Sequence, residues 1–466
     1  MLDQQETTAP AEALRDEDGN VREDYVARVA DAVHRRDGAS LRALVGTLHE
    51  ADTGDLIEAL DAQIRLPLIE LMGRDFDFSA LTEVDDTVRE EILEELPTET
   101  VAEGVRELES DDAVYILEDL PREEQEEILE QLPPTERVAL EQSLFYPENS
   151  AGRRMQTEFV AVPPDWNVGR TIDHLRETDE LPERFYEVYI VDAEGKLLGA
   201  VGLDRIMRSK RPVRIADLMD ADRRRVEAME DQEDVARLFE RYNLVAAPVI
   251  DHTGRLVGVL TFDDIVDVLE EEAEEDIKAL GGITRDEELS DSVWTIVRAR
   301  FPWLFANLLT ALLSAWVIAQ FSGAIEKMVA LAVLMPIVAS MGGNAGTQTM
   351  TVAVRALATR DLGDANSWRV VRREALVGAL NGIGFAIIMG AVAVAWFQVT
   401  ELGLVIGLAM ICVLSAAALG GIVIPLTLIR FGVDPAIASG PFVTTITDVV
   451  GFFSFLGIAT LWFGLR

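Results

Sequence analysis

Residues 435–465 read PAIASGPFVTTITDVVGFFSFLGIATLWFGL and are uncharged except for one aspartate, Asp448. Thirteen uncharged residues precede Asp448 in this stretch and 17 follow it. A helix rises about 1.5 Å per residue and needs about 20 apolar residues to cross a bilayer. The stretch therefore predicts a membrane helix that carries a carboxylate near mid-bilayer depth.

Four segments upstream lack Asp, Glu, Lys and Arg altogether, and each is longer than the roughly 20 residues that a span requires. They are residues 301–325, 328–354, 375–400 and 402–429. Together with 435–465 they predict an all-α membrane domain of five helices over 298–466. Two of these helices could be broken by prolines and glycines, namely Pro336, Gly342, Gly343, Gly440 and Pro441.

Basic residues border these segments unevenly. They gather before the first segment, between the second and third, and between the fourth and fifth: Arg298, Arg300, Arg355, Arg360, Arg369, Arg372, Arg373 and Arg430. The opposite loops hold only Lys327, with Arg466 at the end of the chain. Because Lys and Arg concentrate in cytoplasmic loops, we expect a multi-pass protein of the cell membrane, with its N-terminus in the cytoplasm and its C-terminus outside.

A carboxylate near mid-bilayer is costly unless it meets water or a cation, which makes Asp448 a candidate cation site in a pore. The alternative is a protonated or hydrogen-bonded structural aspartate, helped by Thr444, Thr445 and Thr447. We favour the pore site, because ionisable residues within membrane helices are functional as a rule.

Other parts of the membrane region are also candidates for a pore lining. The segment 341–348, MGGNAGTQ, is polar and rich in glycine, so Asn344 is a candidate pore residue, with close helix packing as the alternative. Asp434 would place a carboxylate at the cytosolic mouth, or would simply cap the last helix. For the pair Gly378 and Gly382, close helix packing is the better interpretation.

The rest of the chain is strongly acidic. The 466 residues contain 41 Lys and Arg against 82 Asp and Glu, but only 10 basic and 7 acidic side chains lie from Arg298 onward. A division this uneven excludes a single globular domain, and the acidic part is an unsuitable partner for nucleic acid. The chain has only four lysines, and an acidic, lysine-poor surface is also typical of proteins that stay soluble in high salt. Charge alone therefore does not establish cation sensing.

Residues 155–273 contain an internal repeat at an offset of 59. The stretch 188–199, VYIVDAEGKLLG, corresponds to 247–258, APVIDHTGRLVG. Both copies predict a strand, an Asp…Gly turn and a second strand, followed by a helix. Helices expected at 168–178 and 232–242 complete two βαββα units.

This repeat resembles a tandem pair of CBS domains, with copies at 151–214 and 215–268. The resemblance implies an adenine-nucleotide site built on Ser/Thr-x-x-Asp after the second strand. Thr261 and Asp264 fit that pattern, whereas the first copy departs from it at 202–205, GLDR. One nucleotide site, such as one for ATP, and no site at all are the two alternatives.

Three Leu-x-x-Leu-Pro motifs mark the region 24–150: LEELP at 93–97, LEDLP at 117–121 and LEQLP at 129–133. Because proline ends a helix, these motifs predict short amphipathic helices in an α-superhelical N domain. Residues 1–23 are polar and are expected to be disordered.

Residues 267–282 read DVLEEEAEEDIKALGG and place seven acids before a pair of glycines. They predict an acidic connecting helix, which we place at 269–297. Like charges on one helix repel each other and the acidic domains around it. Such a helix is reasonable if multivalent cations bridge the surfaces.

The order of helical N domain, CBS pair, acidic connecting helix and five spans resembles the MgtE family of magnesium channels. The motifs that carry the resemblance are Pro336 with 341–348, RALATRD at 355–361, and the last segment from Asp434 to Asp448. The resemblance implies a homodimer in the bilayer with an ion path on its axis, where Asp448 binds Mg²⁺ and Asp434 lies at the pore mouth.

The resemblance also implies a cytosolic Mg²⁺ sensor that ties the N domain, the CBS pair and the connecting helix together. The matching acids are Glu99, Glu103, Asp231, Glu233, Asp263, Asp264, Asp267, Glu272, Glu275 and Asp276. Charge then suggests how the pore is gated. At low internal Mg²⁺ these acids repel and the domains separate, whereas at high Mg²⁺ the ion bridges them and holds the pore closed.

Mg²⁺ prefers an octahedron of oxygen ligands and gives up its waters reluctantly, which suits a pore with few carboxylates. The single cysteine, Cys412, and four scattered histidines form no cluster that would favour zinc or copper. Two other functions stay open: a membrane sensor whose CBS pair reads nucleotide, and a secondary carrier for divalent cations. The sequence shows no nucleophile–base pair, so we do not expect an enzyme.

Overall fold

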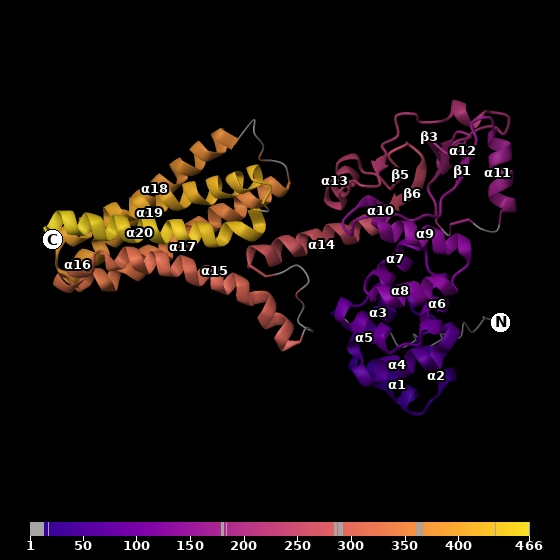
Figure 1. Ribbon diagram of the computed structural model, residues 1–466, viewed down its shortest axis with the longest axis horizontal. Coiled ribbons are helices and arrows are strands. Elements are labelled where there is room, and N and C mark those ends of the chain that lie inside the picture. Colours follow the sequence, from indigo (N-terminus) through magenta and orange to yellow (C-terminus); the bar gives the residue numbers. More distant parts are fainter. Residues whose placement is uncertain are drawn as a thin grey trace, which may run out of the picture. The chain divides into compact units, whose positions relative to one another are not determined.

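The computed structural model describes residues 14–16, 18–178, 181–182, 184–283, 287, 292–359, 362, 367–433 and 435–465. The chain forms two compact units, Met1–Glu271 and Glu272–Arg466. The first contains short helices and two small sheets, and the second contains long helices (Figure 1).

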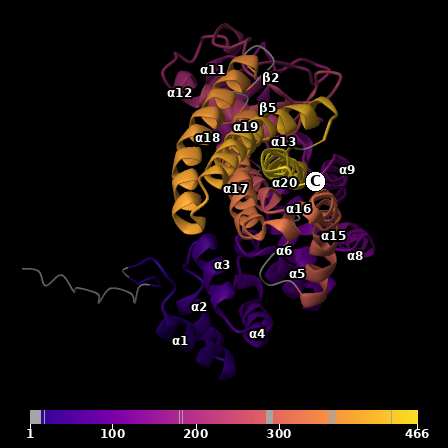
Figure 2. The ribbon, with the colours of Figure 1, turned by 90° about the vertical axis from the view of Figure 1, so that its left-hand side faces the viewer.

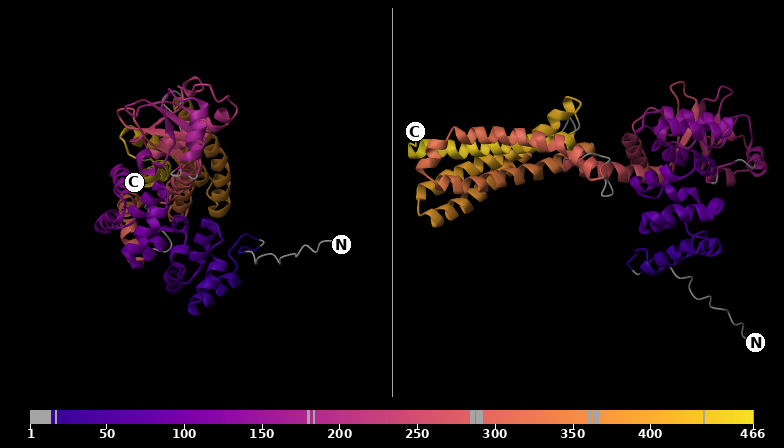
Figure 3. Two further views of the ribbon diagram at one scale, coloured as in Figure 1. Left: turned by 90° about the vertical axis from the view of Figure 1, so that its right-hand side faces the viewer. Right: turned by 60° about the horizontal axis from the view of Figure 1, so that its bottom comes forward.

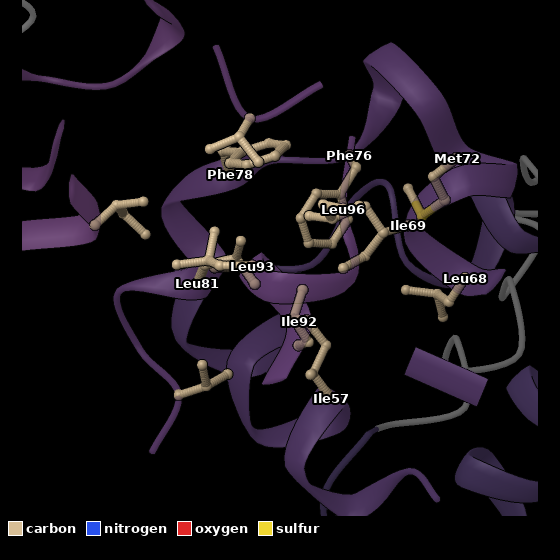
Figure 4. Packing of buried hydrophobic residues seen from close by; sticks show 14 of the residues in the cluster. Ile57, Leu68, Ile69, Met72, Phe76, Phe78, Leu81, Ile92, Leu93 and Leu96 are labelled. Atoms are coloured by element: carbon tan, nitrogen blue, oxygen red, sulfur yellow. The ribbon is translucent and has the colours of Figure 1, made fainter. Parts of the chain in front are cut away.

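The first unit begins with a series of short helices. They are α1 (Glu23–His34), α2 (Gly38–Leu44), α3 (Glu50–Ala59), α4 (Ala62–Met72), α5 (Asp86–Glu95), α6 (Thr98–Glu107), α7 (Ser110–Glu118), α8 (Arg122–Gln131) and α9 (Pro134–Phe145), with 3₁₀ turns at Gly73–Asp75 and Phe78–Leu81. Their apolar faces share one core, in which Ile57, Leu81 and Ile92 pack together (Figure 4). The predicted all-helical N domain is confirmed.

The three Leu-Pro motifs set the boundaries between these helices. Pro97, Pro121 and Pro133 occupy the N-cap positions of α6, α8 and α9. Proline lacks the N–H that would continue the preceding helix, and its fixed φ suits the start of the next one. Both leucines of each motif are buried in the core.

The expected disorder over 1–23 is wrong for the last part of that range. Leu14 is buried in the core of the N domain, and the guanidinium of Arg15 pairs with Asp52 at 2.7 Å and with Asp55 at 2.5 Å. A lone leucine among polar residues carries no periodic pattern, so the sequence did not indicate this contact. Residues 1–13 and 17 lie outside the described residues.

Two three-stranded sheets follow, and they obey the predicted repeat. The first contains β1 (Ala161–Val162), β2 (Glu187–Val191) and β3 (Leu197–Gly202), and the second contains β4 (Val226–Glu227), β5 (Ala246–Ile250) and β6 (Leu256–Thr261). In each sheet the first pairing is parallel and the second antiparallel. The register Glu187↔Gly202 recurs as Ala246↔Thr261, at the offset of 59.

The helices of the repeat are also found where the sequence predicts them. They are α11 (Val168–Glu177) and α12 (Leu203–Met207) in the first copy, with α13 (Gln232–Tyr242) in the second. Gly195 and Gly254 adopt φ of +81° and +83° in the hairpin turns, a conformation that favours glycine. A further short helix, α10 (Ala151–Arg154), precedes β1.

The acidic helix α14 (Phe262–Leu280) continues directly from β6. It begins before residue 269, where we placed the connecting helix, and it ends at the predicted glycines, with Gly282 at φ +71°. Ala279 and Leu280 at its end pack against Met350, Val354 and Val443 within the second unit. Of the expected remainder, 284–286 and 288–291 lie outside the described residues.

Five helices of the described chain are long and apolar enough to cross a membrane. They are α15 (Val293–Ala319), α17 (Ala330–Ala358), α18 (Ser367–Phe397), α19 (Thr400–Arg430) and the Ser439–Phe463 part of α20 (Pro435–Phe463). A short helix, α16 (Ser322–Lys327), follows α15. The long helices α17, α18 and α20 all pack against α19 (Figures 2 and 3). The expected helical membrane domain is thus confirmed in its architecture.

The expected breaks at glycine and proline are wrong, because α17 and α20 run without interruption through Pro336 and Pro441. Small residues bring the long helices together instead. A Cβ added at Gly378 of α18 would lie 2.6 Å from Ala418 Cβ, and one at Gly382 would lie 2.9 Å from Ile411 Cα. The packing interpretation of this glycine pair is confirmed.

Candidate metal sites

Asp448 lies in the middle of α20 and is half-buried in the single chain. The neighbouring threonine hydroxyls turn to their own helix: Thr444 donates to Gly440 O at 3.0 Å and Thr445 to Pro441 O at 2.6 Å. Within the described part of the chain, the Asp448 carboxylate has no hydrogen bond or ion pair. A carboxylate at this depth needs a partner, and the chain described here does not supply one.

Asn344 lies on α17, in the glycine-rich segment predicted to line a pore. Gly342 and Gly346 are buried, and a Cβ on them would lie 2.6 Å from Val413 Cγ2 and 2.7 Å from Val443 Cγ1, respectively. Their role is therefore close packing of α17 on α19 and α20. Asn344 is exposed, as are the other members of a polar stripe along α17: Ser340, Thr347, Gln348 and Thr351.

A polar stripe of this length is unsuited to lipid, which cannot hydrogen-bond to it. In the segment 341–348, Gly342 and Gly346 thus pack against neighbouring helices, whereas Asn344, Thr347 and Gln348 form an exposed polar side. Asp434, the predicted mouth residue, lies outside the described residues.

The predicted cytosolic sensor acids are spread over several elements. Glu99 and Glu103 are exposed on α6, where Glu103 pairs with Arg74 at 2.7 Å. Asp231 caps α13 by accepting from Glu233 N at 3.0 Å, and Glu233 pairs with Arg237. These four acids are thus placed on surfaces or caps.

Three predicted acids lie in the first turns of α14, and the structure brings two of them near acids of the N domain. Asp264 accepts from the Thr261 hydroxyl at 2.5 Å and from Thr261 N at 3.3 Å, and burial raises its pKa. Burial and, after it, the Asp264 carboxylate raise the pKa of Asp112 on α7 to about 7. Asp267 contributes to the raised pKa of Glu83, again after burial. Asp263 is exposed beside them.

No sequence pattern marks Glu83, Asp111 and Asp112 as neighbours of α14. Asp111 and Asp112 stand in the first turn of α7, where acids are expected because they complement the helix dipole. Because the helix dipole already explains acids at these positions, the sequence gives no reason to expect a contact with α14. Burial and repulsion from Asp264 also raise the pKa of Asp111.

The last predicted acids, Glu272, Glu275 and Asp276, are half-buried and share one face of α14 with Ala279. Ala279 packs onto the membrane helices α17 and α20. Among the described residues, no group of three or more acidic, His or Cys side chains is arranged to hold a metal ion within one chain.

Family models match three regions of the chain. The family model described as a divalent cation transporter, MgtE, matches residues 335–458, and the MgtE intracellular N domain matches 48–149. CBS domains match 151–211 and 215–271. A solved structure described as the cytosolic domain of the Mg²⁺ channel MgtE in complex with ATP is 29% identical, with a TM-score of 0.48, and covers 52% of this chain and 99% of its own.

The chain is also similar to curated proteins along most of their length. It is 30% identical to the magnesium transporter MgtE of Bacillus subtilis over 91% of this chain and 95% of that protein. It is 36% identical to the magnesium transporter MgtE of Thermus thermophilus over 70% of this chain and 73% of that protein. The MgtE protein of Enterococcus faecalis is 34% identical, over 70% and 72%. The chain therefore belongs to the MgtE family of magnesium transporters.

Proposed function

We propose that this chain carries Mg²⁺ through a pore lined by Asp448 and formed by two copies of the chain, and that internal Mg²⁺ closes the pore. The observation that carries the proposal is the Asp448 carboxylate, which is half-buried in α20 without a hydrogen bond or ion pair in the described part of the chain. A hydrated divalent cation supplies the missing countercharge and binds through its waters.

The polar stripe of α17 supports the dimer. Asn344, Thr347 and Gln348 are exposed in a single chain, although the helix that carries them is long and apolar enough to cross the bilayer. A second copy, related by a two-fold axis along the membrane normal, would enclose the two stripes and the two Asp448 carboxylates around one aqueous path. The loop arginines support a cytoplasmic N-terminus and an outside C-terminus.

The gating part of the proposal rests on like charges placed together. Asp111 and Asp112 of α7 lie near Asp264 of α14, and Glu83 lies near Asp267. Asp111, Asp112 and Asp264 are partly buried, and carboxylates brought together in such a place repel each other unless a proton or a cation neutralises them. Internal Mg²⁺ would join the N domain to α14 at these points, and its removal would release them.

A nucleotide is a further candidate ligand of the CBS pair. Thr261 and Asp264 are bonded to each other as the cap of α14. A cavity of about 470 Å³ lies between the first copy and the start of the second, lined by Glu187, Asp204, Arg205, Arg208 and Arg223, among others. Arg223 is paired with Glu187, whereas the exposed guanidiniums of Arg205 and Arg208 have no ion pair in the described part of the chain. We propose that these two arginines receive the phosphates of ATP.

The central test compares Asp448→Asn with the wild type in proteoliposomes. The substitution keeps the side-chain volume and removes the charge, so Mg²⁺ uptake should fall by about tenfold or more. The matched control is Ser454→Ala on the same helix. The Ser454 hydroxyl donates to Gly451 O of its own helix at 3.2 Å, and uptake by this variant should equal that of the wild type.

Retained uptake in Asp448→Asn would overturn the pore proposal. Single-channel currents distinguish a channel from a carrier, and a protein that binds nucleotide without any flux would instead be a membrane sensor. Inside-out patches test the gate: open probability should fall as Mg²⁺ on the cytosolic side rises. Unchanged open probability would overturn the gating part alone.

A further inference from the structure

The short helix α10 is attached to the second CBS copy by its backbone. Ala151 N donates to Glu230 O and Gly152 N to Ala228 O, both at 2.8 Å. Gln156 and Val259 exchange two backbone hydrogen bonds of 2.8 Å. α10 also contacts α7 and α9 of the N domain. The backbone of α10, and with it the Cα of each of its side chains, is therefore held in place between the N domain and the second CBS copy.

Arg154, the last residue of α10, connects three elements of the first unit. Its guanidinium donates to Glu271 Oε2 on α14 at 2.8 Å and to Gln232 Oε1 on α13 at 3.2 Å. It also lies 3.9 Å from Glu118 Oε1 on α7, and its Cζ lies 5.6 Å from the centre of the Tyr115 ring. The side chain is 17% exposed, so water screens these interactions weakly.

The Glu118 and Glu271 carboxylates repel each other, and the Arg154 guanidinium faces both of them. Arg153 lies 3.7 Å from Glu118 and, among the described side chains, forms no ion pair with α14. Asp267 is also within electrostatic reach of Arg154. One fixed cation thus faces acids of both the N domain and α14. Elsewhere along α14, Asp264 faces Asp111 and Asp112 of α7, and these carboxylates repel each other.

A second direct contact between protein side chains holds the first residue of α7, Ser110. The Ser110 hydroxyl donates to Glu158 Oε2 at 2.7 Å and accepts from Thr157 N at 2.7 Å. α7 is therefore bonded directly at both ends to the segment 154–158. These contacts position the acids of α7 near Asp264 and do not require a metal ion.

We infer that Arg154 is a positioning residue for the cation-controlled gate: it keeps Glu118 of the N domain and Glu271 of α14 together without a metal ion and so lowers the Mg²⁺ concentration that closes the pore. This inference rests on the proposed gating. Because the guanidinium already neutralises one acidic contact, Mg²⁺ has to bridge only the remaining ones. Removing the guanidinium breaks its hydrogen bond to Glu271 and leaves the repulsion between Glu118 and Glu271 less well compensated, although Arg153 still lies 3.7 Å from Glu118.

The test uses the full-length protein and the variants Arg154→Gln, Arg154→Lys and Arg153→Gln. In inside-out patches, Arg154→Gln should raise the half-inhibiting Mg²⁺ concentration about fivefold or more, because a hydrogen-bonded charge is lost. Arg154→Lys should shift it less, and Arg153→Gln, which leaves the link to α14 intact, should shift it least. The control Arg122→Gln removes an exposed arginine whose partner is Glu126 on the same helix, and it should have no effect.

A rescue separates positioning from general loss of structure. Adding Glu118→Gln and Glu271→Gln to Arg154→Gln removes the repelling pair and should return the half-inhibiting concentration towards the wild-type value. A merely damaged fold would not recover when two more side chains are changed. An unchanged half-inhibiting concentration in Arg154→Gln would overturn the inference.

Hydrogen exchange in Mg²⁺-free buffer supplies a readout that does not depend on gating. Amides of α7 and of residues 149–156 should exchange faster in Arg154→Gln than in the wild type, and equal rates would overturn the metal-free link. If wild-type currents ignore internal Mg²⁺, the proposed gate fails, while the exchange measurement still decides whether Arg154 joins the N domain to α14.

Discussion

The Asp112 carboxylate of α7 lies within electrostatic reach of the Asp264 carboxylate of α14, and burial together with this repulsion raises the pKa of Asp112 to about 7. An unfolded aspartate has a pKa of about 3.9. The folded protein therefore binds a proton at Asp112 more tightly than the unfolded chain does. The stability that this proton contributes is fully present below the pKa of the unfolded aspartate. It is lost as the pH rises through the pKa of Asp112 in the folded protein.

We predict that, without Mg²⁺, the first unit becomes less stable between pH 6 and pH 8, by about 1 kcal/mol for Asp112 alone. Mg²⁺ at pH 8 should restore the loss, since the ion replaces the proton as countercharge. Thermal unfolding of the purified full-length protein at both pH values measures this. Asp112→Asn should reduce the pH dependence, whereas Glu123→Gln, at an exposed position on α8, should keep it. An unfolding temperature that is the same at pH 6 and pH 8 in the absence of Mg²⁺ would contradict the electrostatic argument.

Adjacent glycines of α17 offer a matched pair for the packing of the membrane helices. A Cβ at Gly342 would lie 2.6 Å from Val413 Cγ2, whereas a Cβ at Gly343 would meet nothing within 4 Å. We predict that Gly342→Ala destabilises the membrane domain by about 1–3 kcal/mol, because it overpacks a close contact. Gly343→Ala should leave the stability unchanged or slightly higher. Unfolding in detergent, followed by the loss of helical signal, compares the two, and equal stabilities would argue against the close contact.

Most of the architecture could be predicted from sequence because it follows local rules. The Leu-x-x-Leu-Pro motifs gave helix boundaries, since proline cannot continue a helix and its neighbouring leucines are buried. The offset of 59 gave the strand register, because both copies keep the Asp…Gly turn, and Gly195 and Gly254 do adopt positive φ. The uncharged segments gave the spans.

The parts that could not be predicted depend on contacts between distant residues. Leu14 joins the N-domain core although its neighbours are polar. Asp112 approaches Asp264 across 152 positions of sequence, and Arg154 reaches Glu271 across 117. Periodic patterns in the sequence do not indicate such pairs. Asp112 lies in the first turn of α7, where the helix dipole alone explains an acid.

Arg89 provides a test of the N-domain core. Its side chain is 1% exposed, and its guanidinium pairs with Asp119 and with Asp86, each at 2.5 Å. It also lies 4.3 Å from the centre of the Tyr115 ring. We predict that Arg89→Met destabilises the first unit by about 3–5 kcal/mol, because Asp119 is left without its countercharge. Chemical unfolding measures the loss.

Two further variants make this prediction specific to the buried pair. Arg89→Met combined with Asp119→Leu should recover part of the stability, since no unpaired carboxylate remains at position 119. Arg122→Met removes an exposed arginine on α8 and should cost less than about 1 kcal/mol. If Arg89→Met and Arg122→Met were equally stable, the ion pairs of Arg89 would contribute nothing.

Thr261 separates two explanations of the Thr-x-x-Asp motif at 261–264. Its hydroxyl and its N–H both bond to the Asp264 carboxylate at the start of α14, which is the geometry of a helix cap. We predict that Thr261→Val lowers the stability of the first unit by about 1 kcal/mol, while ATP binds with unchanged affinity. Thr261→Ser keeps the hydroxyl and should preserve the stability. Calorimetric titration with ATP, together with thermal unfolding, distinguishes the two explanations. A large loss of ATP affinity without a loss of stability would show that the motif binds the nucleotide. ATP would then contact Thr261 or Asp264 in addition to Arg205 and Arg208.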